Sequence, residues 1–139
     1  MRINTLLVAA AILIPAFPAS AQQDLIKGVY ARSAEQCAAA KKNFNEFVEN
    51  GELVLTTDGI EGVEYNCQIV DWKARKRGPG AVATMLCEEP GFATPEIYAV
   101  MPRGEGELEF TLSSAISQGE EPGNYGMWYL CKGVKLPAQ

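Results

Sequence analysis

The chain has 139 residues, with 12 Lys and Arg against 17 Asp and Glu, a formal net charge of −5 and no histidine. An acidic chain repels nucleic acid and anionic membrane surfaces and attracts cationic partners. The absence of histidine excludes Ser-His-Asp and Cys-His nucleophilic systems, His-ligated zinc and acid–base catalysis by imidazole. We therefore expect a protein that is not an enzyme and that has no cofactor, no metal and no nucleic-acid partner.

Residues 1–21 have the three parts of a secretory signal peptide. Arg2 supplies the positive charge, residues 6–14 form an uninterrupted apolar core, and residues 19–21 are small, as a cleavage site requires. A membrane anchor is the alternative, but it needs about 20 apolar residues, and this core is about half that length. We expect residues 22–139 to form a single exported domain, periplasmic or secreted, without a membrane span.

Four cysteines follow the expected cleavage site: Cys37, Cys67, Cys87 and Cys131. An even number of cysteines in an exported domain indicates two disulfides. A structural metal site is the alternative, but such sites contain closely spaced pairs, and no two cysteines here are close in sequence. We favour Cys37–Cys67 and Cys87–Cys131. The other two connectivities stay open, and a direct Cys67–Cys87 bond is the most natural competitor.

The predicted elements begin with a short strand over residues 26–32, followed by one helix. Ser33 and Gln36 have the spacing of a capping box at the start of this helix, and Asn50-Gly51 is typical of its end. Apolar residues recur between them at helical spacing, which predicts a side facing the core. These residues are Cys37, Ala40, Phe44, Phe47 and Val48.

The rest of the chain has the pattern of strands and turns. Strands are predicted over residues 53–57, 63–73, 81–88, 96–101, 107–112 and 127–132. If the hairpin of residues 63–88 is symmetric about Arg77, Cys67 faces Cys87 and Ile69 faces Met85, and these side chains share one face with Tyr65. We expect an α+β fold, mainly antiparallel β, in which six or seven strands curl into a partial barrel with one helix near the N-terminus.

Adjacent carboxylates are the main acid–base option that remains without histidine. Glu88-Glu89 falls at the end of a predicted strand, where neighbouring side chains point to opposite faces. Glu120-Glu121 falls in a loop flanked by Gly and Pro. A glycosidase needs two carboxyl groups held at a set distance around a cleft, and adjacency in sequence does not provide this. We expect no catalytic pair.

A cluster of cations is predicted at the tip of the hairpin symmetric about Arg77. Lys73, Arg75, Lys76 and Arg77 fall within five residues and precede Gly78-Pro79-Gly80. One interpretation is a solvated tip that prevents edge-to-edge association. The other is a cationic finger that enters an anionic pocket on a partner. We refer to residues 73–80 as the basic tip.

The closing segment, residues 119–133, combines an acidic loop with Tyr125, Trp128 and Tyr129. Trp and Tyr are typical anchors of protein interfaces, but they are also common in strands. Packing in the sheet and binding of a partner are therefore both open for these aromatic residues. Asn124 and Tyr125 are the part of the segment that we expect to be exposed.

Trp128, Lys132 and Gly133 resemble the Trp…Lys-Gly element of the periplasmic and membrane-bound inhibitors of c-type lysozyme. The signal peptide, the size, the barrel-like sheet, the linked cysteines and the Tyr/Trp-rich closing segment are also similar to this family. The chain lacks the family's Ser/Gly-rich run before its Tyr and has Cys131 where Thr is usual. Its four cysteines exceed the usual pattern of the family.

The resemblance implies a periplasmic protein that inhibits a peptidoglycan hydrolase, such as c-type lysozyme, by occluding its active-site cleft. An acidic domain is steered towards cationic lysozymes, and a lysozyme cleft contains two carboxyl groups that cations neutralise. We expect the partner-binding residues Lys73, Arg75, Lys76, Arg77, Asn124 and Tyr125 to act together, at one end of the barrel if the last strand runs away from that end. The alternatives are a non-catalytic assembly or interaction protein of the envelope, and a small-ligand carrier or small enzyme with its site inside the barrel. The oligomeric state stays open.

Overall fold

The computed structural model describes residues 25–113 and 124–137. The signal peptide predicted for residues 1–21 and Glu120-Glu121 lie outside these ranges. In the described ranges, no helix has the length and apolar character needed to cross a membrane. The elements are β1 (Tyr30–Ala31), α1 (Ala34–Lys42), α2 (Phe44–Glu49), β2 (Val54–Leu55), β3 (Gly59–Gly62), β4 (Tyr65–Ala74), β5 (Ala81–Glu89), β6 (Phe92–Gly104), β7 (Glu107–Leu112) and β8 (Gly126–Leu130).

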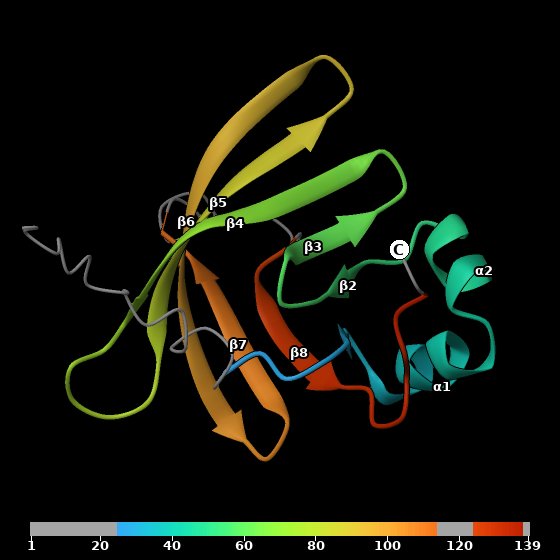
Figure 1. The fold of residues 1–139 in the computed structure, drawn as a ribbon, viewed down its shortest axis with the longest axis horizontal. Helices are drawn as coiled ribbons and strands as arrows, with labels where there is room; N and C mark the ends of the chain where they lie inside the picture. The colour runs from blue at the N-terminus through green and yellow to red at the C-terminus, as the bar shows by residue number, and fades with distance from the viewer. Residues whose placement is uncertain (1–24, 114–123, 138–139) are drawn as a thin grey trace, which may run out of the picture.

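The strands form one closed antiparallel barrel in which spatial order follows chain order (Figure 1). The first strand, β1, pairs with both β2 and β8, which closes the sheet. The prediction of a mainly antiparallel β fold is confirmed. The prediction of a partial barrel with six or seven strands and one helix is wrong, because the described residues form eight strands and two helices. Closure pairs all the strand edges, which removes the edges that a partial barrel would expose.

The additional strand is β3, where the sequence predicts only a turn. Gly59 begins β3 at a φ of 147° opposite Gln68, and a Cβ at this position would lie 1.8 Å from the carbonyl oxygen of Cys67. Only glycine allows so close an approach of two backbones. The glycine that signals a turn therefore also permits the pairing of β3 with β4.

Two helices replace the single predicted helix because Asn43 interrupts it. Asn43 has extended backbone, caps the end of α1 by donating its N–H to the carbonyl oxygen of Ala39, and accepts the N–H of Glu46 at the start of α2. The predicted capping at Ser33 is present, since its Oγ accepts the N–H of Gln36 at 3.2 Å. The two short helices pack beside the barrel, on the side of β1, β3 and β8 (Figure 1).

The hairpin of β4 and β5 has the predicted register from Asn66 to Ile69, but not between the bulge and the turn. Cys67 faces Cys87 and Ile69 faces Met85, as symmetry about Arg77 requires, and a β-bulge follows Ile69. Beyond the bulge the pairing is offset by one residue, so that Ala74 faces Ala81. Alternation along both strands places the side chains of Cys67, Met85 and Cys87 inside the barrel, where they are buried.

Large aromatic side chains fill the barrel. Tyr98, Phe110 and Trp128 are buried, with ring centroids 5.8 Å apart for Tyr98 and Phe110 and 6.4 Å apart for Phe110 and Trp128. A second, smaller cluster that includes Ala40 and Phe47 lies between the helices and the sheet. The helical side predicted to face the core is thus buried as expected, but against the outside of the barrel.

Two disulfides are present, but not with the connectivity that we favoured. The bonds join Cys37 to Cys131 and Cys67 to Cys87. Cys67 and Cys87 face each other in register, with Cα atoms 3.9 Å apart, so each is held next to the other. Cys37 in α1 lies beside Cys131, which directly follows β8. The first bond therefore ties the helices to the end of the chain, and the second is a rung between adjacent strands.

Candidate functional site

The basic tip forms the turn between β4 and β5. Arg75 closes the turn through its N–H, which donates to the carbonyl oxygen of Gly80 at 2.9 Å, and its Nη1 donates to the carbonyl oxygen of Pro79 at 3.2 Å. Gly78 and Gly80 have φ values of 79° and 115°, which a residue with a Cβ rarely adopts. The Gly-Pro-Gly sequence therefore shapes a compact turn on which the cations are displayed.

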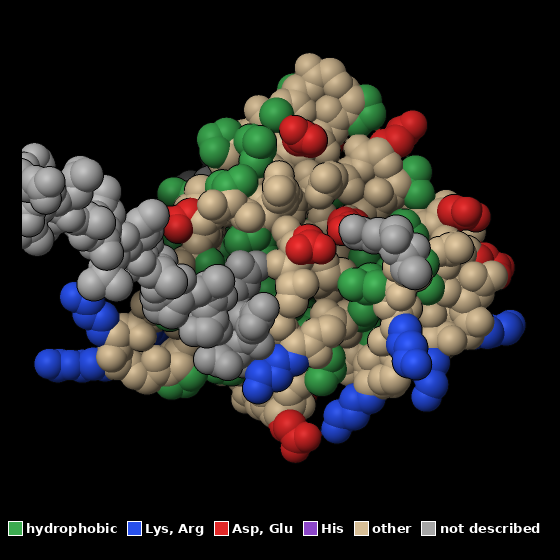
Figure 2. Space-filling model, viewed as in Figure 1, with side chains coloured by type: hydrophobic (Ala, Val, Ile, Leu, Met, Phe, Trp, Pro, Cys, Tyr) green, Lys and Arg blue, Asp and Glu red, His purple; other side chains and the backbone are tan. Residues whose placement is uncertain are grey.

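The four cations of the basic tip are exposed and have no carboxylate partner within the described residues. Lys73, Arg75, Lys76 and Arg77 are all exposed, and Figure 2 shows Lys and Arg side chains extending from the end of this hairpin, at the lower left. The ion pairs that the described ranges contain join Arg103 to Glu109 and Lys132 to Glu105. The charges of the tip are thus left for contacts with another molecule or with solvent.

Asn124 and Tyr125 lie at the opposite end of the barrel from the basic tip. Every strand is antiparallel to its neighbours, so β4 and β8 run in the same direction. The basic tip follows the end of β4, whereas Tyr125 precedes the start of β8. The prediction that these two segments share one end of the barrel is therefore wrong.

Asn124 and Tyr125 are held by the barrel rather than free in a loop. The carbonyl oxygen of Asn124 accepts the indole N–H of Trp128 at 3.2 Å, and the carbonyl oxygen of Tyr125 accepts Nη2 of Arg32 at 2.6 Å. Both side chains are only partly exposed, and Tyr125 packs against the core inside the barrel. These contacts stabilise the start of β8.

Arg32 is a residue that the sequence did not identify. Its guanidinium lies over the ring of Trp128, 4.7 Å from the centroid, in a cation–π arrangement. Burial lowers the pKa of Arg32, an effect that the charge of Tyr129 opposes. The Nη1 atom of this side chain is buried and has no partner within the described residues. No local pattern marks this arginine, because the contacts of its guanidinium come from Tyr125 and Trp128, far along the chain.

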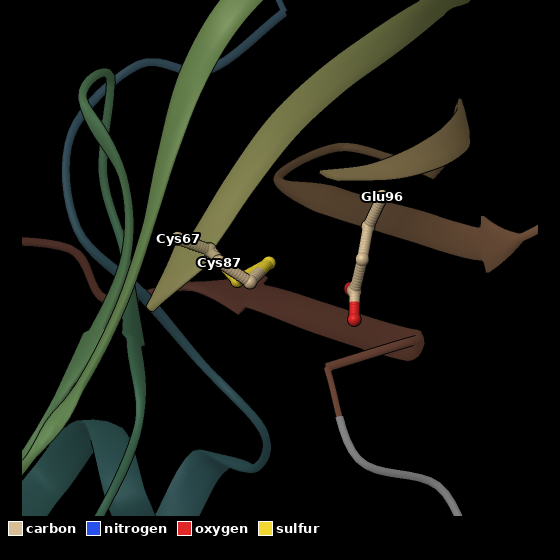
Figure 3. Close-up of side chains that lie close together, drawn as sticks. All are labelled: Cys67, Cys87 and Glu96. Carbon is tan, nitrogen blue, oxygen red and sulfur yellow. A yellow bond between two sulfur atoms is a disulfide. The ribbon is translucent and has the colours of Figure 1, made fainter. Parts of the chain in front are cut away.

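A polar cluster lies inside the end of the barrel that holds Asn124 and Tyr125. Glu96 in β6 extends on the side of the sheet that carries the Cys67–Cys87 disulfide (Figure 3), and its carboxylate accepts a hydrogen bond from the hydroxyl of Tyr98. The hydroxyl of Tyr65 donates to Sγ of Cys67 at 2.6 Å. The amide nitrogen of Asn124 lies 3.7 Å from the same sulfur. Residues from β4, β5, β6 and the segment before β8 thus meet here.

The polar cluster has the residue types of a metal site, but its two cysteines are not in the thiolate form that binds a metal ion. Ligand atoms of Cys67, Cys87 and Glu96 lie within 4.8 Å of one another. A metal ion binds cysteine as a thiolate, and these two sulfurs are bonded to each other. One carboxylate remains as a charged ligand, so the oxidised cluster does not fit a transition-metal ion.

Both tyrosines of the cluster are held in the neutral form. Burial raises the pKa of Tyr65 above its usual range, and the negative charges of Glu96 and Glu89 raise it further. Burial also raises the pKa of Tyr98, together with its hydrogen bond to Glu96 and the charge of that carboxylate. Neutral phenols donate hydrogen bonds and do not act as nucleophiles. The cluster therefore holds strands together rather than offering a reactive group.

The described residues also line a groove beside the helices and another at one end of the barrel. The larger, of about 390 Å³, borders the helices and contains the carboxylates of Glu35, Glu46 and Glu52. Glu46 and Glu52 accept hydrogen bonds from the side-chain amides of Asn43 and Gln36 within the groove. The smaller, of about 320 Å³, lies at the end of the barrel that holds the turn between β6 and β7.

The adjacent carboxylates Glu88 and Glu89 do not converge, as strand alternation predicted. Both residues belong to β5, so their side chains point to opposite faces of the strand.

Comparisons with known proteins do not assign a family, because no family model, no curated protein and no solved structure matches this chain. The basic tip is therefore the candidate functional site, and its geometry and charge are the basis for a function.

Proposed function

We propose that this protein is an exported inhibitor of a peptidoglycan hydrolase of the c-type lysozyme class, and that the basic tip enters the catalytic cleft of the enzyme. Four exposed cations at the end of one hairpin, without carboxylate partners in the described residues, support this function most directly. A lysozyme cleft holds two carboxyl groups. Arginine forms strong, charge-assisted hydrogen bonds with such groups.

The body of the protein is suited to present such a tip. A closed barrel filled with aromatic side chains gives β4 and β5 a fixed direction, and little flexibility is then lost on binding. The two disulfides are consistent with an oxidising compartment outside the cytoplasm, which is where peptidoglycan hydrolases act. Periplasmic location is part of the proposal.

The net charge and the tip have different roles. The chain carries a formal charge of −5, and the cationic surface of many lysozymes attracts an acidic protein over a long range. The tip then meets the carboxyl groups of the enzyme's cleft. Asn124 and Tyr125 have no part in this contact, because they lie at the other end of the barrel.

Lysis of cell walls by a c-type lysozyme, with and without the purified protein, tests this function. We expect the wild-type protein to slow lysis at a small molar excess. Arg75→Gln with Arg77→Gln should raise the inhibition constant at least about tenfold, since truncation of a buried interfacial cation costs about 2–5 kcal/mol. Lys41→Gln with Lys42→Gln is the matched control, because it removes two exposed cations from α1 and should leave inhibition unchanged.

Two outcomes would contradict the proposal. A wild-type protein that does not slow lysis at several-fold excess over a panel of lysozymes is not an inhibitor of this class. If the tip variant inhibits as well as the wild type does, with the same melting temperature, the tip is a solvated turn. An interaction protein of the envelope would then be the better interpretation.

A further inference from the structure

The outer face of the sheet next to the basic tip is uncharged, and apolar except for one Thr, over two adjacent strands. Along β5 the outward positions are Val82, Thr84 and Leu86, and along β6 the outward partners of these residues are Ala99, Ile97 and Pro95. These six residues are uncharged and form three consecutive cross-strand pairs. We call them the outer apolar face.

The outer apolar face is open to solvent within the described part of the chain. Val82 and Ile97 are 46% and 48% exposed, although both are large aliphatic residues. Val70, in the bulge of the neighbouring strand β4, is also 55% exposed, but the next residue, Asp71, is the exposed partner of Thr84, so a carboxylate borders this side of the face. The helices α1 and α2 pack against β1, β3 and β8, on another side of the barrel (Figure 1), so no described element covers this face.

The outer apolar face is continuous with the basic tip. Val82 is the cross-strand partner of Lys73, the first cation of the tip. Outward side chains therefore pass directly from cations to aliphatic groups along one hairpin. At the far end of the face, the next outward position on β5 is Glu88. The face thus has cations at one end and carboxylates at its β4 side and its far end, Asp71 and Glu88.

We propose that the outer apolar face is the second half of the surface that docks the hydrolase, packing against an apolar rim of its cleft while the tip lies inside. This inference rests on the proposed function. A stable complex buries about 800 Å² on each partner, which is more than a turn of a few residues offers. Charged pairs at the tip also need surrounding contacts that exclude water before they contribute much binding energy.

A protein fits this surface better than a lipid does. An anionic membrane would attract the tip but repel Glu88 and the net negative charge of the chain. The outer apolar face also lacks the Trp and Tyr that anchor proteins at a membrane interface. A protein cleft that is anionic inside and apolar at its rim complements both the cations and the aliphatic side chains.

The double variant Val82→Thr with Ile97→Thr tests this inference. It keeps the β-branched shape of both residues, and therefore the strand, but replaces a methyl or ethyl group with a hydroxyl group. We expect about a tenfold higher inhibition constant against the same c-type lysozyme, with an unchanged melting temperature. Val63→Thr with Leu136→Thr is the control, because these residues are 49% and 43% exposed but lie off the face, and it should inhibit as the wild type does.

The outcomes separate the two proposals. If the wild type does not inhibit, both the function and this docking surface are rejected. If inhibition depends on Arg75 and Arg77 but is unchanged in the Val82→Thr, Ile97→Thr variant, the outer apolar face is not part of the interface and the function stands. Sedimentation with phosphatidylglycerol vesicles that is lost in this variant, with inhibition unchanged, would assign the face to lipid and overturn the inference.

Discussion

Trp128 makes three kinds of contact that hold the closing strand β8 in place. Its ring packs edge-on against Phe110, the guanidinium of Arg32 lies over its face, and its indole N–H donates to the carbonyl oxygen of Asn124. The side chain has no exposed surface. Each contact joins β8 to a different part of the chain, so this residue contributes to closure of the barrel as well as to its core.

We predict that Trp128→Ala lowers the free energy of unfolding by about 3–5 kcal/mol. It leaves a large cavity, and the carbonyl oxygen of Asn124 and the guanidinium of Arg32 lose their contacts with the indole. Chemical denaturation followed by far-ultraviolet circular dichroism measures this loss. Phe92→Ala is the control, since Phe92 is 58% exposed and surface substitutions change stability by about 0.5 kcal/mol or less. Equal losses in the two variants would contradict the role of Trp128.

The polar cluster makes stability depend on pH in the alkaline range. The pKa values of Tyr65 and Tyr98 are raised, first by burial and then through Glu96, whereas an unfolded tyrosine titrates near pH 10. Below that pH both states keep the protons and the stabilisation is complete. Above it the unfolded chain loses protons that the folded protein retains, so the free energy of unfolding falls as pH rises.

We predict that Glu96→Gln makes this alkaline loss of stability less steep. The substitution removes the negative charge that raises the pKa of both tyrosines, while the effect of burial remains. Urea denaturation at a series of pH values from neutral to about 11 measures the slope. Glu88→Gln is the control, because Glu88 points outward from β5 and should leave the slope unchanged. A slope that is the same in the Glu96→Gln variant would show that this carboxylate does not affect the tyrosines.

At the scale of elements, local patterns predicted every strand except β3, but not the pairing that closes the barrel. Symmetry about Arg77 predicted that Cys67 faces Cys87, but not the offset of the pairing next to the turn or the β-bulge after Ile69 that gives this register. The strands β1 and β2 lie within segments predicted as strands but have two residues each, and their pairing joins parts of the chain that are far apart in sequence. Closure through β1 and β8 is therefore a long-range property that no single segment encodes.

The same distinction applies to the candidate sites. The basic tip was predictable because four cations fall next to one another in one turn. The polar cluster was not, because Tyr65, Glu96 and Asn124 come from three separate parts of the chain and meet only after the barrel has closed. The disulfide pairing could likewise be predicted only where it depends on local sequence. Cys67–Cys87 follows from a local register, but Cys37–Cys131 required the position of α1 beside the end of β8.

The Cys37–Cys131 disulfide links the helices to the barrel, and its removal should affect them most. It spans 94 positions in sequence, against 20 for Cys67–Cys87. In the chain-entropy model a bond that closes so long a loop stabilises the fold by about 4–5 kcal/mol, and one that closes the shorter loop by about 3 kcal/mol. We predict that Cys37→Ala with Cys131→Ala costs about 1 kcal/mol more than Cys67→Ala with Cys87→Ala.

Denaturant unfolding of the two double variants measures this difference, and hydrogen exchange locates it. Amides of α1 and α2 should lose protection in the Cys37→Ala, Cys131→Ala variant, while those of β4 and β5 keep theirs. Peptide mapping of the unreduced protein provides the control, since it should yield Cys37 linked to Cys131 and Cys67 linked to Cys87. Uniform loss of protection across the barrel would mean that the helices are not a separate unit tied by this bond.

At the scale of the whole molecule, charge is distributed unevenly. The chain is acidic overall, with a net charge of −5, yet four of its 12 Lys and Arg lie in the basic tip. Under the proposed function, the body attracts a cationic enzyme at long range and the tip pairs with its cleft at short range. Long-range attraction affects mainly the association rate, whereas a buried charged pair affects mainly the dissociation rate. The two roles can therefore be separated by kinetics.

We predict that replacing Lys73, Arg75, Lys76 and Arg77 with Gln speeds dissociation from a c-type lysozyme at least about tenfold without slowing association. The substitutions make the body more acidic, so attraction to a cationic enzyme is kept or increased. Surface plasmon resonance at low and physiological ionic strength measures both rate constants. Higher salt should slow association for the wild type and the variant alike, because exposed charges are screened beyond about 8 Å. If the variant instead associates more slowly and dissociates at the wild-type rate, the tip acts in attraction and does not lie in the cleft.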